Sequence, residues 1–327
     1  MSLVHFHPKR FLPRRKFIFF GMFAPLTAGT AAPRQETEHP HAHPVQPAAQ
    51  PQTVNHPSRQ VFDAHLHCPD EDGNVWQWHP VTPTFDEFDA YLTKTGVQRG
   101  IINSVRSQQA KTAKAFIQGN REVAQRVEKS KGRYLGACVV NPLFIDEALR
   151  EMEDCRKQLG MIWVGELCNY TVPYEYSIRE FEQLVNQAVK LNMILDVHTE
   201  LDEMNYIIEK FPQATIVFPH FGDGREFNDI FKRIDAVAKH PNTYLDTSGS
   251  GHDRVGMLEY ALNAIGPDRV LFGSDFSIND PSTVIARIEN ALITEEQRQK
   301  ILSGNLETLL RKFGSGGLAA QSSAEPK

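Results

Sequence analysis

Several features are scarce in this sequence of 327 residues, and each scarcity excludes a class of protein. Four cysteines are too few and too scattered for a disulfide-stapled scaffold, and no two of them form a Cys-x-x-Cys pair. No apolar run reaches the roughly 20 residues of a membrane-spanning helix, so a stable transmembrane span is not expected. No Gly-x-Gly-x-x-Gly motif follows the first predicted strand, which removes the main signal for a dinucleotide-binding fold.

Positive charge is scarce in most of the chain. Residues 1–60 carry seven basic and two acidic side chains, whereas the rest of the chain carries 28 basic and 38 acidic ones. An excess of negative charge repels phosphate backbones, so nucleic acid is not expected as a partner. With 41% hydrophobic and 23% charged residues, the composition is that of an ordinary globular protein with a substantial core.

Residues 1–32 have the three-part layout of an export signal. The basic segment Pro13-Arg14-Arg15-Lys16 precedes an apolar run from Phe17 to Leu26, and small residues follow from Thr27 to Ala32. The paired arginines are typical of a twin-arginine signal, which predicts the twin-arginine export machinery as a partner and a periplasmic location in a bacterium. The alternative is a leader that is never cut and anchors the protein to the membrane.

Two further segments are expected to lie outside any folded domain. Residues 33–60 are rich in Pro, Gln, Ala and His and have too few large apolar side chains for a core, which predicts a disordered linker. Residues 314–327 are expected to form a flexible tail. The folded domain is therefore predicted to span residues 61–313.

The 253 residues of this domain alternate between short β-branched apolar runs and longer stretches with helical periodicity. The eight predicted strands are 61–65, 100–105, 134–140, 162–166, 193–198, 215–220, 243–246 and 270–273. The predicted helices are 84–95, 108–128, 144–158, 178–191, 201–210, 226–239, 254–265, 281–292 and 294–312. Eight strands alternating with helices over about 250 residues predict a (β/α)8 TIM barrel.

Residues that can bind a metal lie at the ends of five predicted strands. The first strand runs into Asp63-Ala64-His65-Leu66-His67, and His65 and His67 project from the same face because side chains alternate along a strand. The other four strand ends carry Glu166, His198, His220 and Asp275. Barrel active sites form at the C-terminal rim, so these residues should converge. Imidazole suits zinc, iron and similar ions, and carboxylates add oxygen ligands.

On these residues the chain resembles the metal-dependent amidohydrolase superfamily, and specifically its amidohydrolase-2 (amidohydrolase-related) branch. The resemblance covers roughly residues 61–313 and includes a Gly-Asn-x-x-x-Leu-Leu ending within residues 301–310. It implies that His65 and His67 are metal ligands and that His198 is a ligand or a bridging neighbour. It also implies that His220 is a ligand or a catalytic side chain, and that Asp275 is both ligand and general base.

Glu166 departs from the best-known pattern of the superfamily, in which a carboxylated lysine on the fourth strand bridges two metals. A glutamate at this position resembles the metal-dependent deoxyribonuclease-like hydrolases, in which it is a metal ligand, and so favours two metals. Decarboxylase members of the amidohydrolase-2 branch use one. We therefore expect one or two divalent cations per chain, zinc first, with manganese or iron as alternatives.

The resulting functional hypothesis is a metal-dependent hydrolase that acts on an ester, lactone or amide bond of a small molecule. Metal-activated water would attack the carbonyl carbon, Asp275 would take the proton, and His220 would stabilise the developing charge. The alternative is a metal-dependent, non-oxidative decarboxylase, a lyase acting on a carboxylated small molecule. A third hypothesis is a non-catalytic periplasmic metal-binding protein.

Further residues are candidates for substrate contacts. A carboxylated substrate needs a cationic partner, for which Arg106 and Arg225 are available. Trp78, in the loop after the first strand, could stack on a flat substrate, and Tyr170 follows Glu166 closely enough to reach it. Ser248 and His252, after the seventh predicted strand, are rim candidates. The sequence leaves the substrate and the oligomeric state open.

Overall fold

The computed structural model describes residues 59–76, 81–222 and 227–314. The predicted export signal, nearly all of the predicted linker and tail, and the candidates Trp78 and Arg225 lie outside the described residues. Among the residues that are described, no helix is both long and apolar enough to cross a membrane.

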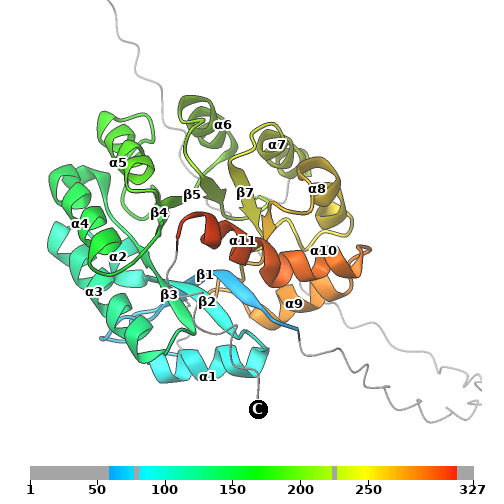
Figure 1. The fold of residues 1–327 in the computed structure, drawn as a ribbon, viewed down its shortest axis with the longest axis horizontal. Helices are drawn as coiled ribbons and strands as arrows, with labels where there is room; N and C mark the ends of the chain where they lie inside the picture. The colour runs from blue at the N-terminus through cyan, green and yellow to red at the C-terminus, as the bar shows by residue number, and fades with distance from the viewer. Residues whose placement is uncertain (1–58, 77–80, 223–226, 315–327) are drawn as a thin grey trace, which may run out of the picture. The chain divides into compact units, whose positions relative to one another are not determined.

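Eight parallel strands form a single sheet in chain order (Figure 1). The strands are β1 (Phe62–Cys68), β2 (Arg99–Ser104), β3 (Tyr134–Cys138), β4 (Trp163–Cys168), β5 (Ile194–His198), β6 (Ile216–Phe218), β7 (Thr243–Asp246) and β8 (Val270–Leu271). The chain just after β8 returns to β1, because the Ala64 N–H donates to the Phe272 carbonyl at 2.8 Å and a parallel bridge joins Leu66 to Phe276. The sheet is thus a nearly closed barrel, and the predicted TIM-barrel fold is confirmed.

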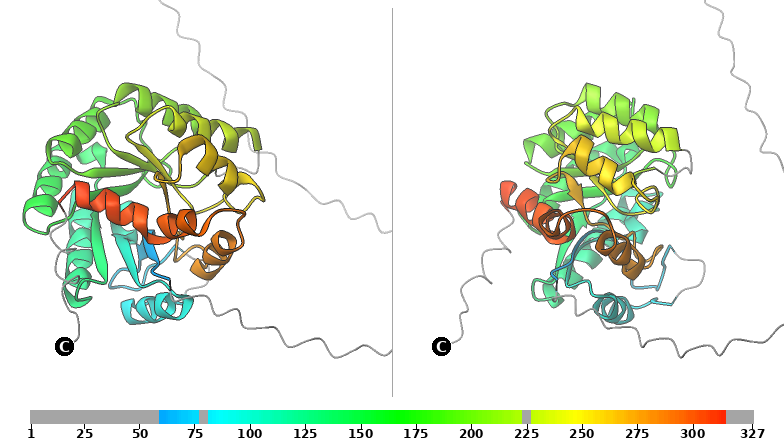
Figure 2. Two further views of the ribbon diagram at one scale, coloured as in Figure 1. Left: turned by 45° about the vertical axis from the view of Figure 1, so that its right-hand side comes forward. Right: turned by 90° about the vertical axis from the view of Figure 1, so that its right-hand side faces the viewer.

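Helices follow the strands, and most of them form the outer ring (Figures 1 and 2). They are α1 (Phe85–Thr95), α2 (Val105–Gln108), α3 (Ala113–Lys129), α4 (Ile145–Lys157), α5 (Arg179–Lys190), α6 (Leu201–Lys210), α7 (Phe227–Ala238), α8 (Met257–Ile265), α9 (Pro281–Glu289), α10 (Glu295–Gln299) and α11 (Asn305–Lys312). Short turns of 3-10 helix (Pro142–Phe144) and π-helix (Lys300–Gly304) precede α4 and α11.

The predicted helix 108–128 differs from the structure, which has two helices in this region. Ser104 caps α2 by accepting from the Ser107 N–H at 3.1 Å, and Thr112 caps α3 by accepting from the Ala115 N–H at 3.2 Å. Two separate N-caps within nine residues start two helices instead of one. The break matters for the site, because it leaves Gln108 at the end of α2, above the barrel.

One end of the barrel is filled by apolar side chains. The starts of the strands contribute Phe62, Ala64, Ile101, Ala137, Trp163, Ile194, Val217 and Leu271, and α11 adds Leu306, Leu309 and Leu310. Figures 1 and 2 show α11 lying across this end of the barrel. The carboxyl ends of the strands, at the other end, are where the polar residues gather.

Candidate metal centre

Four predicted ligands face one another at the carboxyl ends of the strands. The Nε2 atoms of His65 and His67, both on β1, lie 3.2 Å apart. Asp275 Oδ1 lies 3.7 and 2.9 Å from these two nitrogens. Glu166 Oε2, from β4, lies 3.6 and 3.8 Å from them. All four side chains are buried, and His65, His67 and Glu166 form a group of donor atoms that could hold a metal ion, with Asp275 beside the two histidines.

The amide of Gln108 orients His67. The Trp76 indole N–H donates to Gln108 Oε1 at 3.0 Å, and Gln108 Nε2 donates to Glu166 Oε2 at 3.0 Å, so both ends of the amide are assigned. His67 Nδ1 lies 2.9 Å from the same Gln108 oxygen and 3.0 Å from Asn103 Oδ1. Nδ1 therefore carries the proton, and Nε2 presents its lone pair to the cluster, as metal-binding histidines require.

His198 and His220 extend the cluster from β5 and from the residues after β6. His198 Nδ1 lies 2.8 Å from Glu166 Oε1, and the rings of His198 and His220 are 4.9 Å apart. Glu166 therefore faces the β1 histidines with one oxygen and His198 with the other. Cys168, which was not among the predicted ligands, forms a second group of potential donors with Glu166 and His198. The structure thus brings all six predicted ligands into one neighbourhood.

The charges in this cluster favour a cation. Burial acts to raise the pKa of Glu166, but the adjacent His65 and His198 outweigh it and hold that pKa well below the usual value. Burial acts to lower the pKa of His65, and Glu166 and Asp246 raise it well above the usual value. The negative field that favours a proton on His65 also favours a divalent cation in its place.

The backbone is left-handed at two predicted ligands. His220 has φ 65° and Asp275 has φ 63°, a conformation that non-glycine residues adopt infrequently and that costs about 1–3 kcal/mol. Both backbones are held: the His220 N–H donates to Asp246 Oδ1 at 3.2 Å, and the Asp275 N–H donates to the His65 carbonyl at 3.1 Å. The predicted strands 215–220 and 270–273 therefore end early, and these two side chains come from the loops just beyond.

Gly249 provides a test of the importance of the His220 position. It has φ +59°, and a Cβ added there would lie 2.3 Å from His220 Nδ1. Gly249→Ala should displace the His220 ring and lower turnover by roughly 100-fold, because catalytic groups tolerate little misplacement. Gly256→Ala is the matched control, since Gly256 has φ +89° and nothing lies within 4 Å of its added Cβ. Equal turnover of the two folded variants would contradict the prediction.

The two described candidates for substrate contacts lie in different surroundings. Arg106 contacts Asp72 at 2.7 Å and Glu122 at 3.2 Å, so its described ion-pair partners belong to a separate acidic group. Tyr170 is 58% exposed, and its ring lies 4.9 Å from that of His198. The structure therefore places Tyr170 beside the cluster and holds Arg106 in ion pairs with other residues.

His252, in the loop after β7, is buried, and its Nδ1 has no hydrogen-bond partner among the described residues. Burial lowers its pKa to about 4 from 6.5. The unfolded chain therefore binds more protons between these pH values, and stability falls as the pH falls through this window. We expect His252 to cost the protein about 2 kcal/mol between pH 7 and pH 5.

Urea unfolding at pH 7 and pH 5 measures this cost. His252→Gln should lose less unfolding free energy than the unmodified protein does over the same change of pH. His240→Gln removes a partly exposed histidine and controls for the substitution itself. If the pH dependence of His252→Gln and of the unmodified protein were the same, the assignment to His252 would be wrong.

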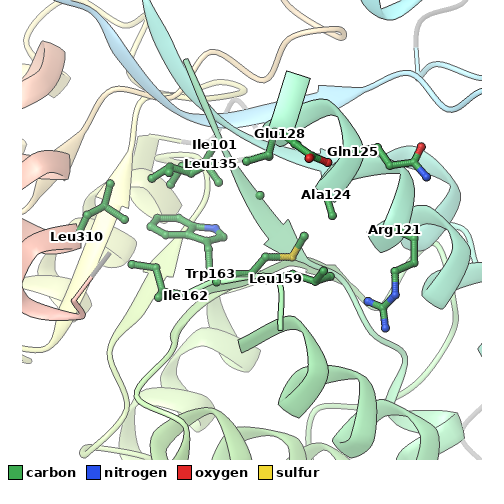
Figure 3. Close-up of a pocket in the computed structure, with 14 residues that line it drawn as sticks. Ile101, Arg121, Ala124, Gln125, Glu128, Leu135, Leu159, Ile162, Trp163 and Leu310 are labelled. Carbon is green, nitrogen blue, oxygen red and sulfur yellow. The ribbon is translucent and has the colours of Figure 1, made fainter. Parts of the chain in front are cut away.

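A separate cavity of about 640 Å³ lies at the α11 end of the barrel (Figure 3). Its lining is mainly apolar and includes Ile101, Leu135, Trp163 and Leu310, from the early parts of the strands and from α11. No predicted ligand is among its lining residues. This cavity is therefore distinct from the candidate metal centre.

Comparisons with known proteins connect the fold and the centre to one family. The family model described as amidohydrolase matches residues 62–312. A gamma-resorcylate decarboxylase from Polaromonas sp. strain JS666 is 25% identical over 271 residues, which cover 65% of this chain and 79% of that protein.

Two solved structures share the fold. A dihydroxybenzoic acid decarboxylase from Polaromonas sp. JS666, with bound manganese and the inhibitor 2-nitroresorcinol, has a TM-score of 0.64 and 20% identity over 80% of this chain and 99% of its own. A 5-carboxyvanillate decarboxylase from Novosphingobium aromaticivorans, complexed with manganese and 4-hydroxy-3-methoxy-5-nitrobenzoic acid, has a TM-score of 0.64 and 13% identity, covering 77% and 96%.

These relatives correct the predicted reaction. The hydrolase hypothesis is wrong, because the curated relative and the similar structures of known activity described above are decarboxylases, which are lyases. The error arises because the same histidines and carboxylates serve a cation in both reaction classes. Zinc is not confirmed either, since both of these structures hold manganese.

Proposed function

Because the chain belongs to the amidohydrolase family, we propose that it is a manganese-dependent, non-oxidative decarboxylase of a hydroxylated aromatic carboxylic acid. The observation that carries the proposal is the buried set of His65, His67, Glu166 and Asp275, in which Glu166 Oε2 and Asp275 Oδ1 each lie within 4 Å of both histidine Nε2 atoms. This donor set accepts manganese as well as zinc. The curated decarboxylase relative supplies the reaction class.

The reaction breaks the bond between the ring carbon and the carboxyl carbon, places a proton on the ring carbon and releases carbon dioxide. It requires no oxidant or reductant, but it does require an acid beside the ring. Asp275 suits this role: its Oδ1 faces His67, while Oδ2 accepts from Asn279 Nδ2 at 3.3 Å and is the oxygen available to carry a proton. The bound cation would supply an electrophilic anchor for the substrate's oxygens.

Two arginines of the described residues are already engaged. Arg106 is paired with Asp72 and Glu122. Arg233, buried on α7, donates to the carbonyls of Thr199 and Pro219. We therefore assign the binding of the substrate's anionic groups to the cation position and to the adjacent histidines.

Two aromatic side chains lie beside histidines of the centre. Tyr170 is exposed beside His198, and the Trp76 ring lies 6.1 Å from that of His67. Aromatic side chains stack on flat rings or meet them edge to face. A substituted benzoate carries both the flat ring and the oxygens that the centre would bind.

The proposal is tested by supplying Mn²⁺ and separate panels of substrates to the purified chain. We expect carbon dioxide and the matching phenol in equal amounts from at least one member of a panel that includes 2,6-dihydroxybenzoate and 5-carboxyvanillate. Removal of the cation with a chelator should abolish the release, and Mn²⁺ should restore it. Hydrolysis of an ester or lactone panel, with no carbon dioxide from any carboxylate, would overturn the proposal.

A further inference from the structure

Asp246, the last residue of β7, lies behind two histidines of the centre. Its Oδ2 lies 3.1 Å from His65 Nδ1. Its Oδ1 accepts the backbone N–H groups of Ser248 at 2.9 Å and of His220 at 3.2 Å, and the Ser248 hydroxyl contacts the same oxygen. Ser248 Oγ also lies 2.8 Å from His220 Nδ1. One buried carboxylate is thus connected directly to His65 and, through a hydroxyl, to His220.

The available protons give these contacts a direction. The Asp246 carboxylate has no proton to donate, so the Ser248 hydroxyl must donate its single proton to Oδ1. Ser248 Oγ can then only accept from His220, which places a proton on His220 Nδ1. In the same way, His65 Nδ1 must donate to Asp246 Oδ2. In each neutral ring, Nε2 is left with the lone pair.

We propose that Asp246 and Ser248 are positioning residues that hold His65 and His220 in the tautomer protonated on Nδ1. His65 Nε2 thereby keeps its lone pair for the cation, and His220 Nε2 keeps its lone pair to accept a hydrogen bond from the substrate. The proposal rests on the metal centre of the proposed function and does not depend on the identity of the reaction.

The packing around the network supports a single arrangement. A Cβ on Gly249 would lie 2.3 Å from His220 Nδ1, and a Cβ on Gly273 would lie 2.9 Å from Asp246 Oδ2 and 3.1 Å from the His65 Cβ. The backbone is therefore close against both histidines and the carboxylate that joins them. Asp246 and Ser248 are themselves buried, so water does not compete for these hydrogen bonds.

Asp246→Asn should invert the His65 tautomer. The amide oxygen would still accept the backbone N–H groups of Ser248 and His220, so the amide NH₂ would face His65 Nδ1. That nitrogen would then have to accept, which moves the proton to Nε2 and blocks metal binding. We expect Mn²⁺ affinity to fall by about 10- to 100-fold, as for other residues that orient a metal-binding histidine.

Ser248→Ala should change the tautomer of His220 and leave that of His65 unchanged. It removes the acceptor for His220 Nδ1 but leaves the contact between Asp246 and His65, so Mn²⁺ affinity should stay within about threefold while His220 becomes a mixture of tautomers. Ser248→Thr keeps the hydroxyl and should restore the single His220 tautomer.

Two measurements test whether Asp246 and Ser248 hold the tautomers of His65 and His220. Histidine ¹⁵N NMR of the full chain, saturated with diamagnetic Zn²⁺, reports the tautomers, and electron paramagnetic resonance titration reports Mn²⁺ affinity. Circular dichroism and thermal unfolding establish that each variant is folded. Unchanged tautomers and affinity in folded Asp246→Asn, or an unchanged His220 signal in folded Ser248→Ala, would overturn the proposal. Expected tautomers in a chain that releases no carbon dioxide would refute only the proposed function.

Discussion

Asp275→Asn should lower the rate of carbon dioxide release by about 10²- to 10⁴-fold in a folded protein. The amide keeps the size of the side chain and an oxygen beside His67, but it carries no acidic proton for the ring carbon. It also replaces a carboxyl group whose Oδ1 lies 2.9 Å from His67 Nε2 and 3.7 Å from His65 Nε2. The rate should be measured in single turnovers at saturating Mn²⁺, so that weaker metal binding does not appear as slower chemistry.

Asp196→Asn is the matched control for this prediction. Asp196 is another buried aspartate of the barrel, on β5, and its Oδ2 accepts the Trp163 indole N–H at 3.0 Å. An asparagine can keep that hydrogen bond through its own carbonyl oxygen. If Asp275→Asn slowed the reaction no more than Asp196→Asn did, Asp275 would not be the proton donor.

The barrel could be predicted because its strands are short, apolar and separated by helical stretches. The strand ends were harder to place, because they depend on tertiary contacts. β8 contains only Val270–Leu271, and Asp275, four residues beyond it, is left-handed and hydrogen-bonded to β1. No periodicity in the sequence encodes that contact.

The candidate ligands stand out in the sequence because their residue types are unusual at strand ends, and the same signal is available for Asp246. It ends the seventh predicted strand, 243–246, but is not among the predicted site residues. Gln108 gave no such signal. Its amide reaches Glu166 and His67 from the last residue of α2, because the chain forms a short helix up to Gln108 and a new one after the Thr112 cap, in place of the single predicted helix 108–128.

The reaction class could not be predicted from the ligands, since hydrolysis and decarboxylation can use the same donor atoms. Glu166 at the end of the fourth predicted strand favours two metals and hence hydrolysis. In the structure it has a second set of partners, Gln108 at 3.0 Å and His198 at 2.8 Å, which orient it whether one cation or two are bound. The export signal in residues 1–32 stays a prediction.

Glu166→Gln should lower Mn²⁺ affinity by at least about 100-fold, more than the loss of a residue that only orients a ligand. The change removes a negative charge 3.6 and 3.8 Å from the Nε2 atoms of His65 and His67. The new amide NH₂ must face either Gln108 Nε2 or His198 Nδ1. Facing Gln108, it sets two NH₂ donors against each other. Facing His198, it needs His198 Nδ1 to accept a hydrogen bond, which requires a change of the His198 tautomer.

Glu151→Gln is a suitable control, because Glu151 is buried on α4 and is bound to Asn120 and Arg121 away from the centre. Calorimetric titration with Mn²⁺ gives affinity and stoichiometry together. Reduced affinity in Glu166→Gln alone would make Glu166 a ligand, and the stoichiometry of the unmodified chain would show whether it serves one cation or two. Unchanged affinity with slower turnover would instead place Glu166 among the groups that contact the substrate, and the metal would then depend on His65, His67 and Asp275.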